Sequence, residues 1–288
     1  MTRAASRQSG MDHPHYAWRP QVSRPKVSWP GDANLALCVI VYLEHFEPRG
    51  AIEHSEFSRR EYGNRIGIFR LMEAMDGAGI RGTAAMDVHT ATHSPYLVHA
   101  CRSRNWEIMG HGLVGNQLIT SEMGEGDERR YILQTLDRME KFTGNRPVGW
   151  LGAEFGESQR TPALLAEYGL RYVCDWPNDD QPYLMTVPNG SLVSLPILLE
   201  LDDVFSIEQR HISTMRWARS VDEAATVLAS EGAASARLLT LSVHPWIMGQ
   251  PHRIRVFEEL INRLAADGAW LATGRDISEV VCSWEKSG

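Results

Sequence analysis

The sequence has few cysteines, and no two of them are spaced as a redox or metal-binding pair. The four cysteines are far apart along 288 residues, and no CxxC motif occurs. Cys38 and Cys174 lie in apolar, strand-like stretches, where a thiol serves as a small hydrophobic side chain. We therefore expect reduced, buried thiols and a cytoplasmic location.

Long apolar runs and an excess of positive charge are also missing. No run of 18 apolar residues occurs, and the N-terminal residues 1–20 lack the apolar core of a secretory signal. The formal net charge of -7 provides no positive field to attract phosphate groups. These absences predict a chain that is neither exported nor inserted in a membrane, with no nucleic acid or membrane partner, and favour a small-molecule substrate.

Two further absences limit the chemistry. There is no GxSxG motif and no cysteine beside a histidine, so a nucleophile for an acyl-enzyme is missing. No glycine-rich phosphate loop follows the first predicted strand, which disfavours the doubly wound open sheet that is the alternative fold. If the chain is a hydrolase, water is the expected attacking group.

Buried strands alternate with amphipathic helices along the chain. Residues 35–43, LALCVIVYL, form an apolar run typical of a strand covered on both faces. Seven or eight strand–helix units predict an α/β fold, a distorted TIM-like (β/α) barrel of about seven parallel strands, in one domain spanning residues 31–288. The proline-punctuated residues 1–30 are expected to form an extended arm over the outside or over a partner subunit. Strands are predicted at 35–43, 80–89, 106–112, from 147, 170–175, 191–201, 238–244 and 269–274, and helices at 64–78, 96–104, 125–143, 161–169, 215–231 and from 254.

Ionisable side chains follow most of these strands. His244 ends the apolar run 238–243, and in α/β barrels the C-terminal ends of the strands carry the chemistry. A single histidine there is more often a hydrogen-bonded loop residue, but here other strand ends carry acids and imidazoles too. Together such groups can polarise water, hold a metal, or do both. The predicted rim comprises Glu44, His45, Asp87, His89, His111, Glu157, Asp175, Asp179, Asp180 and His244.

Several motifs together resemble a known family. They are WPG before the first strand, Glu44 at its end, EYGNRIGIFRLM (61–72), EIMGHG (107–112), TGNRPVGW (143–150), the Asp175 loop and LSVHPWIMGQPHR (241–253). Over residues 29–280 the chain resembles the NodB-type polysaccharide deacetylase superfamily, and within it the branch of allantoinases and cyclic imide hydrolases. The resemblance implies the NodB barrel. It also implies that His244 is the general acid, that Asp175 orients it, that Glu44 is the first-motif acid and that His111 is the first metal-binding histidine.

The chain departs from the sugar deacetylases in two places. Their first strand ends in a double-Asp motif, whereas residues 42–47 read YLEHFE. Their second metal histidine follows the first by four residues, and that position is Gly115 here. The Asp-His-His triad is therefore incomplete, and Trp150 and Glu157 stay unassigned candidates.

The predicted function is hydrolysis of a non-peptide C–N bond in a cyclic amide, imide or ureide. Glu44, alone or with His111 and a metal, would activate water, and His244 would protonate the leaving nitrogen. A divalent metal such as zinc is expected at the rim. Its candidate ligands are His111, Glu44, His45 and Asp87, with His89 as an alternative to Asp87.

Other assignments complete the hypothesis. A carbohydrate N-deacetylase and a non-catalytic ligand-binding barrel are the alternatives. The proline-rich arm and the family resemblance suggest a homo-oligomer. Residues expected to bind substrate are Tyr62, Asn64, Arg65, Asn116, Trp150 and Trp176.

Overall fold

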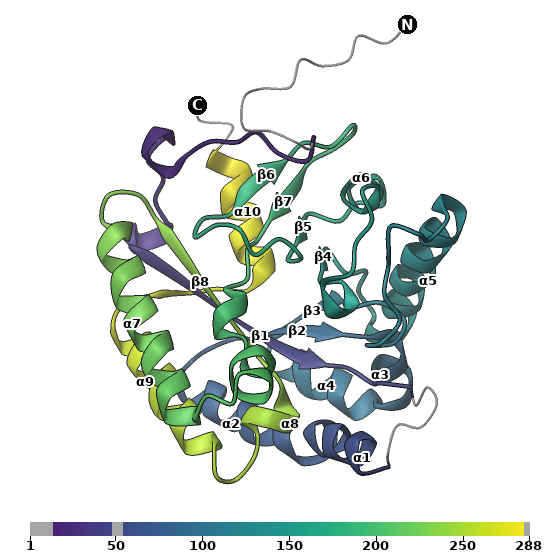
Figure 1. Ribbon diagram of the computed structural model, residues 1–288, viewed down its shortest axis with the longest axis horizontal. Helices are drawn as coiled ribbons and strands as arrows, with labels where there is room; N and C mark the ends of the chain where they lie inside the picture. The colour runs from purple at the N-terminus through teal and green to yellow at the C-terminus, as the bar shows by residue number, and fades with distance from the viewer. Residues whose placement is uncertain (1–13, 48–53, 285–288) are drawn as a thin grey trace, which may run out of the picture.

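A curved, mainly parallel sheet forms the centre of the computed structural model, which describes residues 14–47 and 54–284 (Figure 1). Residues 1–13 of the predicted arm and 285–288 of the predicted domain lie outside these ranges. The strands are β1 (Leu35–Leu43), β2 (Thr83–Met86), β3 (Glu107–Gly110), β4 (Gly149–Trp150), β5 (Tyr172–Val173), β6 (Tyr183–Met185), β7 (Leu192–Ser194), β8 (Arg237–Val243) and β9 (Trp270–Leu271).

The strand order is β6-β7-β5-β4-β3-β2-β1-β8, with β9 also paired to β1. All pairings are parallel except that of β6 with β7. The α/β barrel prediction is confirmed, although among the described residues no pairing joins β8 to β6 and the barrel stays open. Because the strands are parallel, their C-terminal ends meet at one edge, where a site can form.

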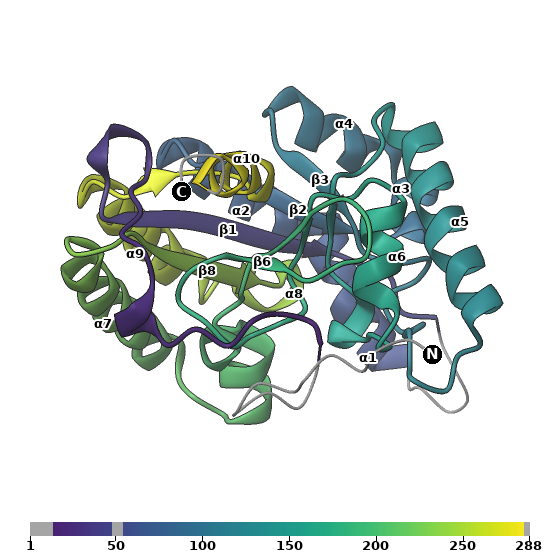
Figure 2. The same ribbon diagram turned by 90° about the horizontal axis from the view of Figure 1, so that it is seen from above.

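Helices follow the strands as expected. They are α1 (His54–Tyr62), α2 (Ile68–Gly77), α3 (Val88–His93), α4 (Pro95–Ser103), α5 (Glu125–Thr143), α6 (Thr161–Glu167), α7 (Thr214–Gly232), α8 (Pro245–Met248), α9 (Ile254–Ala266) and α10 (Gly274–Trp284). Figures 1 and 2 show α2, α7 and α9 on the outer side of β1 and β8. The sequence analysis did not predict α1, β6 or the π-helical turn Val204–Gln209.

Strand β1 separates two apolar cores. All nine of its residues are buried, and because side chains alternate along a strand they divide between the faces. Leu37, Val39 and Val41 pack with the outer helices, whereas Cys38, Ile40 and Tyr42 face the barrel interior with side chains of β5, β7 and α10. The same alternation sends Glu44, two residues after Tyr42, toward the interior at the rim.

The last part of the predicted arm belongs to the core. Trp29 is only 2% exposed, lies against Trp270 and Trp284, and donates its indole N–H to the Arg237 carbonyl at 2.7 Å. Arg24 forms a two-pronged ion pair with Asp179 at 2.6 and 2.7 Å. These contacts fix the described end of the arm against the barrel. In the described ranges, no helix is both long and apolar enough to cross a membrane.

Candidate active site

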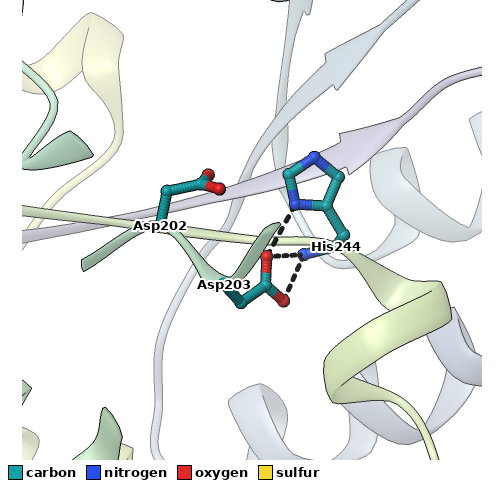
Figure 3. Close-up of side chains that lie close together, drawn as sticks. All are labelled: Asp202, Asp203 and His244. Carbon is teal, nitrogen blue, oxygen red and sulfur yellow. Dashed lines mark hydrogen bonds and ion pairs between the residues drawn. The ribbon is translucent and has the colours of Figure 1, made fainter. Parts of the chain in front are cut away.

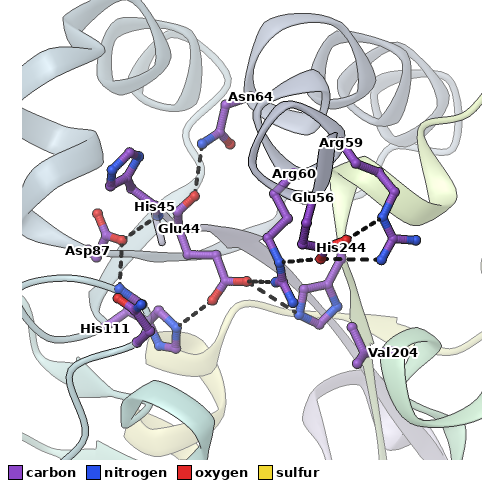
Figure 4. A network of polar contacts seen from close by, with 12 residues as sticks. Glu44, His45, Glu56, Arg59, Arg60, Asn64, Asp87, His111, Val204 and His244 are labelled. Carbon is purple, nitrogen blue, oxygen red and sulfur yellow. Dashed lines mark hydrogen bonds and ion pairs between the residues drawn. The ribbon is translucent and has the colours of Figure 1, made fainter. Parts of the chain in front are cut away.

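Glu44 lies between two imidazoles at the rim (Figure 4). Its Oε2 is 3.3 Å from His111 Nε2, and its Oε1 is 4.0 Å from His244 Nε2. Glu44 follows β1, His111 follows β3 and His244 follows β8, so three strand ends bring these groups together. The sequence analysis predicted this grouping from strand ends alone.

The Tyr42 ring contacts both imidazoles from the barrel interior. Its ring stacks on His244 with centroids 4.0 Å apart, and meets the His111 ring edge-on at 5.4 Å. Tyr42 is 6% exposed and lies in the inner core. Because a packed aromatic ring resists displacement, the spacing of the two histidines on either side of Glu44 is set by the core.

A buried carboxylate orients His244 (Figure 3). Asp203 Oδ1 accepts the His244 Nδ1–H at 2.6 Å, and Asp203 Oδ2 accepts the His244 backbone N–H at 2.9 Å. This arrangement fixes the proton on Nδ1 and turns Nε2 toward Glu44. The neighbouring Asp202 accepts a hydrogen bond from Ser242 at 2.8 Å.

The assignment of Asp175 as the partner of His244 is wrong. Asp203 fills that role, and Asp175 instead accepts the backbone N–H of Gly152 at 2.8 Å. The reason is the path of the chain, since the segment after β7 packs against the end of β8, where Asp202 accepts from Ser242 and Asp203 from His244. Asp203 begins the turn after β7 and reaches back to β8.

The charges around Glu44 set its protonation. Burial alone would raise the pKa of Glu44, but the His111 hydrogen bond and the His244 and Arg60 charges hold it below the ordinary value. Burial would lower the pKa of His244, yet Asp203 and Asp202 outweigh it and raise that pKa to about 9. Burial opposes the charged form of His111 too, but Glu44 raises its pKa. At neutral pH a carboxylate therefore lies beside an imidazolium acid.

One cationic side chain, Arg60, lies beside Glu44. Arg60 lies 3.6 Å from Glu44 Oε1. Its guanidinium is held there by packing over the rings of Phe46 at 4.0 Å and Trp246 at 4.8 Å. Glu56 holds it from the other side at 3.1 Å. These contacts present a positive group at the rim of the site.

The predicted metal ligands do not converge. Both oxygens of Asp87 are occupied, one by the Thr90 N–H at the start of α3 and the other by the N–H groups of His45 and Gly115. The His45 ring stacks on His89, with centroids 3.7 Å apart. Within the predicted set, only Glu44 and His111 bring side-chain ligand atoms together, so the ligand set His111, Glu44, His45 and Asp87 is wrong.

Gly115, at the position of the second metal histidine, has no room for a side chain. A Cβ there would lie 2.9 Å from the Phe46 ring and 3.1 Å from Glu44. The long Glu44 side chain, in place of the shorter aspartate of the sugar deacetylases, fills that space. The two sequence departures are therefore one structural feature.

One group of metal-ligating residue types does occur in the described ranges. Asp202, Asp203 and His244 have ligand atoms within 4.8 Å of one another. However, each carboxylate oxygen of this group already accepts a protein N–H or O–H. The group fits a hydrogen-bonded dyad better than a metal centre, and zinc stays a prediction without a ligand set.

The predicted substrate-binding residues have mixed positions. Asn64 lies close by and donates to the Glu44 carbonyl at 3.0 Å, while Asn116 exchanges hydrogen bonds with the Glu47 backbone. Trp150 is 0% exposed within the core, which excludes it from substrate contact. The others point elsewhere: Tyr62 accepts from Arg70, Arg65 is exposed beside Glu61, and Trp176 packs under His15 and Tyr16.

Other predicted rim residues also lie elsewhere. Asp179 and Asp180 are at the opposite end of β8, where the Asp180 carbonyl accepts the Leu238 N–H. His89 completes a ring stack with His45 and His93. The sequence of a polar loop does not show which edge of the sheet the loop reaches. For that reason, residues from both edges were predicted at one rim.

Three residues of the site were missed. Asp203 is the second residue after the predicted strand 191–201, at the end of the sequence LELDD, so the rule of acids at strand ends would have found it. Arg60 lies on α1, which was not predicted. Glu154 has a left-handed φ of 50°, and burial followed by the Glu44 charge raises its pKa. Non-glycine residues held in this conformation are often found at functional sites.

Comparison with known proteins finds similar solved structures but no similar sequence family. No family model and no curated protein matches the sequence. Among solved structures, Puue allantoinase matches with a TM-score of 0.81 and 23% identity, covering 90% of this chain and 94% of that one. A probable polysaccharide deacetylase from Pseudomonas aeruginosa PAO1 matches with a TM-score of 0.81 and 24% identity, covering 92% and 95%.

A third structure, assigned to a polysaccharide deacetylase of Mycobacterium smegmatis, has a TM-score of 0.81 and 25% identity, with 91% and 95% coverage. The chain thus has the fold of the NodB-type polysaccharide deacetylase superfamily, as its motifs indicated. Within that superfamily it is similar over nearly its whole length to an allantoinase and to polysaccharide deacetylases alike.

Proposed function

We propose that this protein hydrolyses a non-peptide C–N bond in a cyclic amide, imide or ureide. The observation that carries the proposal is the Glu44 carboxylate between His111 and the Asp203-oriented imidazolium of His244. A carboxylate base beside an imidazolium acid is what ring-amide hydrolysis needs. The similarity to an allantoinase structure, whose name denotes a ureide ring, agrees with this class.

The reaction assigns one task to each group. Glu44 removes a proton from water, and the oxygen attacks the carbonyl carbon to form a tetrahedral oxyanion. The N–H groups of His111 and Arg60 stabilise the negative charge. His244 then gives its Nε2 proton to the ring nitrogen as the C–N bond breaks, and Asp203 stabilises the imidazole throughout. No step depends on a metal, because the residues around His111 do not form a ligand set.

Carbohydrate N-deacetylation is the second candidate, favoured by the two deacetylase structures with the same TM-score. Purified protein should be incubated with hydantoin, allantoin, succinimide, dihydropyrimidines and N-acetylated sugar oligomers, and ring-opened product or acetate measured. The proposal predicts ring opening without acetate release. Acetate release alone would establish the second candidate, and no turnover of any compound would contradict both. Oligomeric state, proposed to be a homo-oligomer, can be measured on the same sample by light scattering.

A further inference from the structure

A hydrogen-bonded chain links His111 to two acids that the proposed reaction does not use. His111 Nδ1 is 2.7 Å from the Leu151 carbonyl oxygen. The N–H of the same peptide group, which belongs to Gly152, donates to Asp175 Oδ1 at 2.8 Å. One planar peptide therefore connects the imidazole and the carboxylate, because its carbonyl and N–H dipoles are aligned.

Asp175 in turn faces Glu157. Asp175 Oδ2 and Glu157 Oε1 are buried, and no N–H or O–H group of the described residues donates a hydrogen bond to either oxygen. The two carboxyl groups lie close enough to raise each other's cost of ionisation, and because two neighbouring buried carboxylates are not both charged, one of them keeps its proton. Burial, and then the charge of Asp175, raise the pKa of Glu157 well above its ordinary value. Glu157 therefore carries the proton and Asp175 the charge.

The surrounding chain holds this pair in place. A Cβ at Gly152 would lie 2.6 Å from the Gly156 carbonyl and 3.2 Å from Asp175 Oδ2, so glycine allows the loop to fold over the pair. Trp176, which follows Asp175 in the chain, packs against the rings of His15 and Tyr16. The pair is shielded from water, which strengthens its electrostatic effect.

We infer that Asp175 is a positioning residue that acts on His111 through the Leu151–Gly152 peptide. The Asp175 charge polarises the peptide, and the more negative Leu151 oxygen binds the His111 Nδ1–H more strongly. The ring is thereby fixed with its Nδ1–H on the Leu151 oxygen and its Nε2–H directed at Glu44. The effect on turnover rests on the proposed function, whereas the effect on the imidazole does not.

The test compares Asp175→Asn with Glu157→Gln. Asparagine keeps an oxygen for the Gly152 N–H but removes the charge, whereas glutamine replaces a neutral group with a neutral donor. The side-chain Nδ1–H of His111 is observed by NMR at pH 7 and identified by its loss in His111→Gln. We expect its exchange with water to become at least about tenfold faster in Asp175→Asn and to change less than about twofold in Glu157→Gln.

Unchanged exchange in Asp175→Asn, or an equal effect in both variants, would overturn the inference. The wild-type spectrum tests it without any variant, because a His111 that lacks the Nδ1–H also overturns it. Once a ring substrate is known, Asp175→Asn should lower kcat about tenfold with KM nearly unchanged, and Glu157→Gln should retain wild-type kcat. If no substrate is turned over, the proposed function fails while the NMR result still decides the inference.

Discussion

Replacing Asp203 with asparagine should leave His244 mostly unprotonated above neutral pH, so that it no longer has a proton to give. The charge of Asp203 is the largest contribution that favours the charged form of His244, against the opposing effect of burial. Asparagine retains an oxygen for the His244 backbone N–H but removes that charge. The pKa of His244 should therefore fall from about 9 toward or below the ordinary value of about 6.5.

The size of the effect depends on pH. At pH 8 an imidazole with a pKa of about 9 is about nine-tenths protonated, whereas one with a pKa of about 6.5 is about 3% protonated. Loss of the acid form alone should thus cost about 30-fold in kcat/KM at pH 8, but less than about twofold at pH 6. Any loss of orientation adds a factor that is independent of pH.

The assay is the pH profile of kcat/KM for wild type, Asp203→Asn and the surface control Asp267→Asn. In wild type, activity should fall as the pH rises through about 9, because His244 loses its proton, and should fall again in acid as Glu44 gains one. Asp203→Asn should move the alkaline limb to lower pH by about two units. An alkaline limb in the same place as in wild type would refute the assignment of His244 as the acid.

Four other outcomes are expected. His244→Ala should lose about a hundredfold or more in kcat while thermal unfolding stays near wild type, and wild-type rates would remove the mechanism. Gly115→His should displace Glu44 and lose activity, since a Cβ there would lie 3.1 Å from it; full activity would show that the pocket has more space. Cys38 and Cys174 are fully buried, with the pKa of Cys38 raised by burial to about 12, so alkylation of the native protein should spare both, and rapid labelling would contradict their placement. Activity should survive dialysis against a strong chelator, and its loss with recovery on adding zinc would restore the metal hypothesis.

The parts of the fold with strong local patterns were predictable. Residues 35–43 and 125–143 match β1 and α5 to the residue, because a continuous apolar run and a helical stripe are local signals. The short strand β6 and the turn Val204–Gln209 were not predicted. Tertiary pairing forms these elements, and their own sequences are weakly patterned.

The site shows the same division. That Glu44, His111 and His244 would gather at one edge follows from parallel strands, and this prediction is confirmed. Which acid orients His244 depends on the path of the chain after each strand, and the rule of acids at strand ends does not choose between Asp175 and Asp203. The segment after β7 packs against the end of β8, although five strands lie between β7 and β8 in the sheet, so Asp203 reaches His244 and Asp175 reaches Gly152 instead.

The most direct test of the central claim is ring opening by wild type and by Glu44→Gln on the same panel of cyclic amides, imides and ureides. Glutamine preserves the size of the side chain but cannot take a proton from water. We predict turnover of at least one ring by wild type and a loss of about a hundredfold or more in Glu44→Gln, with unfolding temperatures that agree within a few degrees. Equal rates for the two proteins would show that Glu44 is not the base and would contradict the account.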